Sequence, residues 1–129
     1  MIVRNLNDVK NTDREVVTEG WTSRRLLLAK DGMGFSLHET IIPAGAELKM
    51  HYKNHLESVF CIAGEGLLIN LETNEKHIIS PGVMYALSGH ERHVLKATSE
   101  IRTVCVFNPP LTGREVHGAD GAYPVANQD

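Results

Sequence analysis

The sequence has little of several features that whole classes of protein require. It contains only two cysteines, Cys61 and Cys105. Both lie in apolar runs, so we expect buried thiols in a reducing cytoplasm and no disulfide framework. No apolar run approaches the roughly 20 residues that a helix needs to span a bilayer. The first eight residues contain an acid and no apolar core, so we expect no secretory signal peptide.

An excess of positive charge is also missing. Thirteen Lys and Arg residues stand against sixteen Asp and Glu residues, which gives a formal net charge of −3. Because no basic stripe runs along the chain, we expect neither a nucleic-acid partner nor a membrane partner. The 129 residues, of which 42% are hydrophobic and 22% charged, fit one globular domain over 1–129.

Helix signals are poor, and short β-type runs recur between turn residues instead. One turn is expected at Asn11–Glu15, where Thr12 is a capping residue with Glu15 three positions later. Strands are predicted at Ser23–Ala29, Phe35–Ile42, Glu47–Tyr52, Ser58–Ala63, Gly66–Asn70, Lys76–Ile79, Met84–Leu87, His93–Lys96 and Thr103–Phe107. This pattern predicts an all-β sandwich or small barrel. Beyond the Pro109-Pro110 break, we expect a flap that ends in a flexible tail at about 119–129.

Alternation within two of these strands indicates that one face is polar. One face of the strand at 35–42 carries Ser36, His38 and Thr40. One face of the strand at 103–107 carries Thr103, Cys105 and Phe107. A small barrel whose inward face is polar encloses a ligand site instead of a packed core.

Ligand-capable side chains gather in two segments of the chain. The first segment, between turns at Gly45 and Gly64, carries His51, His55 and Glu57. The second carries Tyr85, His90 and His93. Imidazole and carboxylate groups hold divalent metals in proteins, so two such groups around a hairpin predict a metal pocket inside the barrel.

The first segment resembles the first motif of the cupin superfamily. The positions in register are Gly45, His51, Glu57 and Gly64, whereas Lys53 stands at the second histidine position. The second motif keeps only Gly82 and His93 at their spacing. The resemblance implies a cupin-type jelly-roll β-barrel, but a three-histidine site does not follow from it.

A longer resemblance, to the ectoine synthase family, extends from Met1 to about Val125. The segments that carry it are Met1–Leu6, Gly20-Trp21, Gly32–Ser36, His51–Glu57, Pro81–Leu87, Cys105–Pro110 and Thr112–His117. It implies a cytoplasmic lyase that forms ectoine, a compatible solute of osmotic stress. The substrate implied is N-γ-acetyl-2,4-diaminobutyrate, which loses water on ring closure. The resemblance also implies dependence on Fe(II) and a homodimer, for which an open barrel edge near the N-terminal strand is a plausible pairing site.

The family match maps three metal ligands onto Glu57, Tyr85 and His93. Spacing alone would make Tyr85 an aromatic residue of the barrel wall. The main alternative is a site of His51, Glu57 and His93, and this donor chemistry also accepts zinc or manganese. Three protein ligands leave positions open for water or substrate, as a catalytic metal requires.

The remaining candidates concern the substrate and its protons. Those proposed to bind substrate are Trp21, Ser23, Arg25, Thr40, Cys105 and Phe107. Trp21 is either a core anchor or a pocket wall, and either Arg25 or Arg24 meets the carboxylate, with parity and the family match favouring Arg25. Those proposed to transfer protons are Tyr52, Glu115 and His117, the last two in a segment that is either a free loop or a lid.

Two other functions remain open from the sequence. A cupin dioxygenase would need a mostly imidazole site, and Lys53 argues against one. A non-catalytic cupin that binds a small polar solute would share the same fold, because one fold carries many functions.

Overall fold

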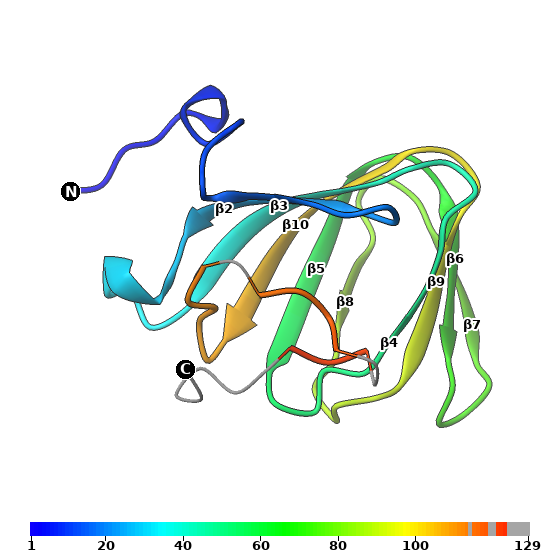
Figure 1. The fold of residues 1–129 in the computed structure, drawn as a ribbon. Coiled ribbons are helices and arrows are strands. Elements are labelled where there is room, and N and C mark those ends of the chain that lie inside the picture. The colour runs from blue at the N-terminus through cyan, green and yellow to red at the C-terminus, as the bar shows by residue number, and fades with distance from the viewer. Residues whose placement is uncertain (114, 119–120, 124–129) are drawn as a thin grey trace.

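Ten β-strands and two single-turn 3-10 helices make up the part of the chain that the computed structural model describes, which is residues 1–113, 115–118 and 121–123 (Figure 1). The strands are β1 (Glu15–Val17), β2 (Thr22–Leu27), β3 (Ser36–Ile42), β4 (Glu47–Met50), β5 (Leu56–Ala63), β6 (Gly66–Asn70), β7 (Lys76–Ile79), β8 (Met84–Ala86), β9 (His93–Ala97) and β10 (Ile101–Asn108). The helical turns are η1 (Leu6–Asp8) and η2 (Ala29–Asp31). No helix among the described residues is long and apolar enough to cross a membrane.

The strands form two antiparallel sheets that face each other. The first has the order β1-β2-β3-β10-β5-β8, and the second has the order β4-β9-β6-β7. Figure 1 shows β2, β3, β10 and β5 as one curved layer, with β9, β6 and β7 forming the other. Buried apolar side chains from both sheets, such as Val59 and Leu95, share one core cluster. The all-β prediction is therefore confirmed.

Most strands lie where the sequence predicted them, and β6 and β7 have the predicted bounds. The strand that sequence reasoning missed is β1, which has only three residues and buries only Val16. At the expected turn, the Thr12 hydroxyl does accept a hydrogen bond from the Arg14 N–H at 3.1 Å. The Glu15 carboxylate accepts from the Asn11 N–H instead of completing a helical cap, and Glu15 begins β1.

The alternation predicted for the barrel strands is confirmed. Ser36 and His38 on β3 are buried, as are Thr103, Cys105 and Phe107 on β10. Because β3 and β10 are paired directly, with His38 opposite Cys105, these side chains form one continuous inner surface. This surface is the polar wall of the barrel interior.

After β10 the chain turns back across the end of the barrel at which β4 and β5 are joined (Figure 1). The peptide bond between Asn108 and Pro109 is cis. The Gly121 carbonyl accepts from the His51 N–H at 3.0 Å, and the Tyr123 carbonyl accepts from the Asn54 amide at 2.8 Å. Residues 121–123 are thus buried against the barrel where a flexible tail was expected, and the rest of the expected tail lies outside the described residues.

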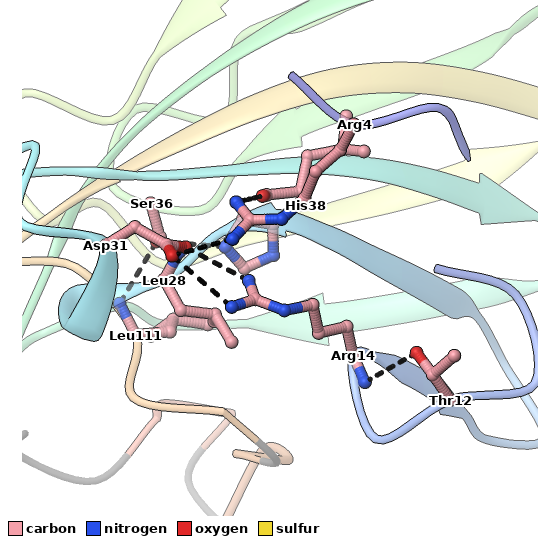
Figure 2. Close-up of polar contacts among 9 residues, drawn as sticks. Arg4, Thr12, Arg14, Leu28, Asp31, Ser36, His38 and Leu111 are labelled. Atoms are coloured by element: carbon pink, nitrogen blue, oxygen red, sulfur yellow. Dashed lines mark hydrogen bonds and ion pairs between the residues drawn. The ribbon is translucent and has the colours of Figure 1, made fainter. Parts of the chain in front are cut away.

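A buried carboxylate ties the N-terminal segment to the barrel (Figure 2). Asp31, in η2, accepts hydrogen bonds from Arg4 at 2.9 Å, from Arg14 at 3.0 Å and from the Leu28 N–H at 2.9 Å. Burial alone would raise the pKa of Asp31, but the Leu28 N–H and the two guanidinium groups hold it well below its usual range. Asp31 therefore fixes the connection between β2 and β3.

Candidate active site

A cavity opens between the two sheets beneath the flap. Its walls include Trp21, Thr40, Glu57, Cys105 and Phe107 from the strands and their flanking segments. Tyr52, His117 and Tyr123 complete it at the flap end. Five of the six residues predicted to bind substrate line this cavity, and Arg25 is the exception.

Glu57 is a buried carboxyl group in the cavity wall. It lies on β5, opposite Phe107 of β10, and is only 8% exposed. Burial raises the pKa of Glu57 to about 8, and a hydrogen bond from the Cys105 thiol lowers it in part. Burial also raises the pKa of Tyr85 well above its usual range, with the nearby Glu57 carboxylate as the next cause. A carboxylate buried in this way calls for a proton or a cation beside it.

His93 presents an imidazole nitrogen that has no partner among the described residues. Its Nδ1 lies 3.0 Å from the Glu91 carbonyl, which can only accept, so the ring proton is on Nδ1. Its Nε2 is buried without a hydrogen bond. A metal-binding histidine has this arrangement, because its second nitrogen is oriented by a carbonyl or a carboxylate.

Tyr85 connects Glu57 to His93. Glu57 and Tyr85 line the first cavity, and Tyr85 and His93 line a second cavity of about 250 Å³ between the β7 and β8 sides of the barrel. Carboxylate, phenol and imidazole are each donor types that a divalent cation accepts. The residues predicted as metal ligands thus surround neighbouring spaces that share Tyr85 as a wall.

The alternative ligand set is not formed. His51 lines neither cavity. Within residues 1–113, 115–118 and 121–123, no three side chains of His, Cys, Asp or Glu come close enough together to hold a metal ion. His55 is buried beside the Phe107 and Tyr123 rings, and His90 occupies a turn with φ +55°.

A tyrosine and a histidine meet at the mouth of the cavity. The Tyr52 hydroxyl lies 2.7 Å from His117 Nε2, and the Trp21 and His117 rings are 5.2 Å apart. Burial lowers the pKa of His117 to about 4, helped by the charge of Arg25, and burial raises the pKa of Tyr52 well above its usual range. The pair therefore holds a neutral imidazole against a protonated phenol at neutral pH.

Glu115 and Arg25 serve the flap itself. The Glu115 carboxylate accepts from the N–H groups of Thr112 at 2.6 Å and Gly113 at 2.7 Å, and Glu115 does not line the cavity. Arg25 is fully buried and donates to the carbonyls of Gly113 and Glu115. Arg24 points to the other face of the sheet, where it pairs with Glu15 and Glu39. Arg25, as favoured, is the arginine on the inner side.

Comparison with known proteins identifies the family. The family model described as ectoine synthase matches residues 1–127. An L-ectoine synthase of Desulfosudis oleivorans is 58% identical over 129 residues, which covers 99% of this chain and 100% of the relative. This chain belongs to the ectoine synthase family. It is therefore an enzyme, a lyase.

Solved structures agree with this assignment. The crystal structure of the ectoine synthase from P. lautus has a TM-score of 0.88 and 51% sequence identity, and the match covers 100% of this chain and 96% of that one. An RmlC-like cupin from Shewanella frigidimarina has a TM-score of 0.61 at 14% identity over 72% of this chain and 79% of that one. At that identity the likeness shows the fold alone, and it confirms the cupin-type barrel.

Two residues of this ectoine synthase site had no predicted role. His38 lines the cavity, and its signal in the sequence was its alternation with Ser36 and Thr40. Tyr123 also lines the cavity and stacks on Tyr52 at 5.3 Å between ring centroids. Its only signal was an aromatic residue in an otherwise polar segment.

Proposed function

We propose that this protein closes N-γ-acetyl-2,4-diaminobutyrate into ectoine. In this reaction the α-amine attacks the acetamide carbonyl carbon, one C–N bond forms, and the carbonyl oxygen leaves as water. Membership of the family supports the proposal. The structural observation that carries it is the position of the Tyr52–His117 pair in the same cavity as the buried Glu57 and Tyr85.

The ring closure makes three physical demands. An amide carbonyl is a poor electrophile, an ammonium is not a nucleophile, and an extended chain has to fold back on itself. Holding two reacting groups of one molecule in a productive geometry can supply roughly 7–11 kcal/mol in favourable cases. A small cavity with aromatic and polar walls suits the third demand directly.

A divalent cation answers the first demand. Glu57, Tyr85 and His93 are the residues that would hold it, and we expect Fe(II), although zinc and manganese suit the same donors. When bound, such an ion polarises a carbonyl oxygen as a Lewis acid. The raised pKa of Glu57 and the orphaned Nε2 of His93 support this assignment, because a cation beside them would stabilise the buried carboxylate and bind the free lone pair of the imidazole.

The Tyr52–His117 pair answers the second demand. The neutral His117 imidazole can accept a proton from the α-amine, and the Tyr52 phenol, which is protonated at neutral pH, can donate its proton to the departing hydroxyl group. The proton on His117 then passes to Tyr52 across their hydrogen bond, which restores both groups. Glu115 is less suited to this task, because its carboxylate accepts hydrogen bonds from flap N–H groups. We therefore assign proton transfer to Tyr52 and His117.

The remaining walls position the substrate. Trp21 and Phe107 offer aromatic faces to the delocalised cation of the product. We place the carboxylate near Ser23, where the positive charge of Arg25 stabilises it, and the amide end near Thr40 and Cys105. The flap end of this cavity is lined by Tyr52, His117 and Tyr123, so a bound substrate lies within reach of the Tyr52–His117 pair.

We further propose a cytoplasmic homodimer whose product acts as a compatible solute under osmotic stress. The support for pairing is the position of β1 at one edge of the six-stranded sheet, where its backbone can extend a sheet across two chains. Val17 on this strand is 67% exposed, which suits burial against a partner. Sedimentation of the purified protein tests this, and a monomer at micromolar concentration would contradict it.

The decisive experiment mixes anaerobic, Fe(II)-loaded protein with N-γ-acetyl-2,4-diaminobutyrate and follows the products by NMR. Appearance of the cyclic product supports the proposed function. Oxygen uptake with other substrates and no cyclisation would favour a dioxygenase, and saturable binding without turnover would favour a solute-binding protein. Either outcome would overturn the proposal.

A further inference from the structure

A chain of hydrogen bonds runs through the cavity wall, with His38 at its centre. His38 is 1% exposed and lines the cavity from β3. Its Nδ1 lies 3.1 Å from the Ser23 hydroxyl, and its Nε2 lies 2.9 Å from the Ser36 hydroxyl. Both ring nitrogens therefore form hydrogen bonds with side chains, although His38 also lines the cavity.

One arm of this chain reaches the first residue of the flap. The Ser36 hydroxyl accepts from the Leu111 N–H at 3.0 Å, and Figure 2 shows the Leu111 nitrogen directed at this serine. The Leu111 carbonyl accepts from the Ala29 N–H at 2.8 Å. Leu111 is fully buried, so both of its backbone groups are fixed where the flap leaves the barrel.

The other arm reaches the flap a few residues later. The Ser23 hydroxyl accepts from Arg25 Nε at 3.2 Å. The terminal nitrogens of Arg25 donate to the carbonyls of Gly113 and Glu115. His38 thus connects two separate attachments of the flap, one at Leu111 and one at Gly113 and Glu115.

The number of donors and acceptors at the two serines explains why a histidine suits position 38. Each serine oxygen already accepts one N–H, from Leu111 or from Arg25, and each serine has a single hydroxyl proton to give. A neutral imidazole donates from one nitrogen and accepts at the other, so it can satisfy one serine as donor and the other as acceptor. Burial lowers the pKa of His38 well below its usual range, with the charge of Arg25 as the next cause, and this keeps the ring neutral.

We propose that His38 is a positioning residue that sets the closed position of the flap, and thereby places His117 against Tyr52. The predicted effect on the reaction rate rests on the cyclisation proposed above. The predicted effect on the position of the flap does not. Leu111 and His117 belong to one short flap segment, so a shift at the Leu111 attachment changes the 2.7 Å contact between His117 and Tyr52. A residue that merely filled the core would leave flap dynamics unchanged.

The test compares amide hydrogen exchange and steady-state kinetics in metal-loaded variants. His38→Phe keeps a ring of similar shape but removes both hydrogen bonds. His38→Gln retains an amide at the Nε2 position for Ser36, and Ser36→Ala removes only the Leu111 arm. The control is Ile78→Phe, which introduces the same ring at a β7 residue that is 75% exposed and lines neither cavity.

In His38→Phe we expect exchange in peptides covering 111–117 to accelerate about tenfold, as for loss of one or two hydrogen bonds, with β6 and β7 unchanged. We expect kcat to fall about tenfold with a smaller change in KM, and His38→Gln to recover part of both effects. Ser36→Ala should accelerate flap exchange in the same direction, and Ile78→Phe should change neither measurement.

Unchanged flap exchange in His38→Phe would overturn the proposal, even if kcat fell. Should that variant fail to fold, Ser36→Ala decides in its place by the same criterion. Accelerated flap exchange in a protein whose wild type shows no cyclisation would uphold the positioning role of His38 and refute the proposed function instead. The two hypotheses therefore fail separately.

Discussion

The hydroxyl of Tyr52 and Nε2 of His117 lie 2.7 Å apart, although 65 positions separate the two residues in the chain. Tyr52 follows β4, and His117 is brought to it by the flap. The Trp21 and Tyr123 rings lie against His117, at 5.2 Å and 4.6 Å between centroids. A hydroxyl and an imidazole enclosed by aromatic rings are shielded from water, which strengthens the interaction between them.

The first prediction concerns this pair. Tyr52→Phe and His117→Ala should each lower kcat about a hundredfold, because each removes one partner of the proton-transfer pair. The double variant should lose little more than either single variant, since the two groups act as one unit. Steady-state kinetics with the NMR assay checks this. Additive losses in the double variant would contradict the prediction.

The second prediction separates the two possible metal sites. Glu57→Ala and His93→Ala should each lose bound metal and activity together, because each removes a direct ligand. His51→Ala should bind metal at the wild-type stoichiometry, because His51 lines neither cavity. Metal content of purified, reconstituted protein measures all three. Loss of metal in His51→Ala would instead favour the alternative ligand set, which shares Glu57 and His93 with the proposed one.

The strands were predictable because their signals are local. Alternation of side chains and Gly-containing turns give β6 and β7 their bounds, and they place Thr103, Cys105 and Phe107 on one inner face. The strand β1 was not predictable, because three residues with one buried side chain give no periodic pattern. Its place depends on pairing with β2, as in the register of Val16 with Ser23.

The sequence could predict a site residue only where the alternation of side chains along a strand, or the spacing of a motif, indicates its position. The position of Arg25 on the inner side follows from its parity with Trp21. Its bonds to Gly113 and Glu115 do not, because 88 and 90 positions separate the partners and the flap carries no periodic signal. Tyr123 was missed for the same reason. The flap end of this cavity is therefore formed by long-range contacts between irregular segments.

The third prediction concerns the turn at Gly64, which has φ +87°. A Cβ atom there would lie 2.0 Å from the Glu100 carbonyl oxygen, so the backbone of the two turns would have to separate. Gly64→Ala should lower the free energy of unfolding by about 4 kcal/mol or prevent folding. Gly82→Ala is the matched control, because φ is +98° there and a Cβ would contact nothing within 4 Å.

Gly82→Ala should cost about 1 kcal/mol, the price of the left-handed backbone conformation alone. Urea unfolding followed by tryptophan fluorescence measures both variants. Equal losses in the two variants would show that the close approach to Glu100 does not determine the stability of this turn.

The last prediction concerns the carboxylate that anchors the N-terminal segment (Figure 2). Asp31 accepts from Arg4, Arg14 and the Leu28 N–H, so Asp31→Asn should lower the free energy of unfolding by about 2 kcal/mol at pH 7. The pKa of Asp31 is depressed in the folded protein relative to about 3.9 in the unfolded chain. Its contribution is therefore fully present above pH 5 and is lost as the pH falls below 4.

The difference between wild type and Asp31→Asn should accordingly be largest at neutral pH and should shrink on acidification, because asparagine does not titrate. Urea unfolding at a series of pH values from 7 to 3 measures it. Glu72→Gln, which breaks an exposed pair with Arg92, is the control and should change stability little at any pH. A difference between wild type and Asp31→Asn that stays constant down to pH 3 would show that Asp31 contributes through packing and not through its charge.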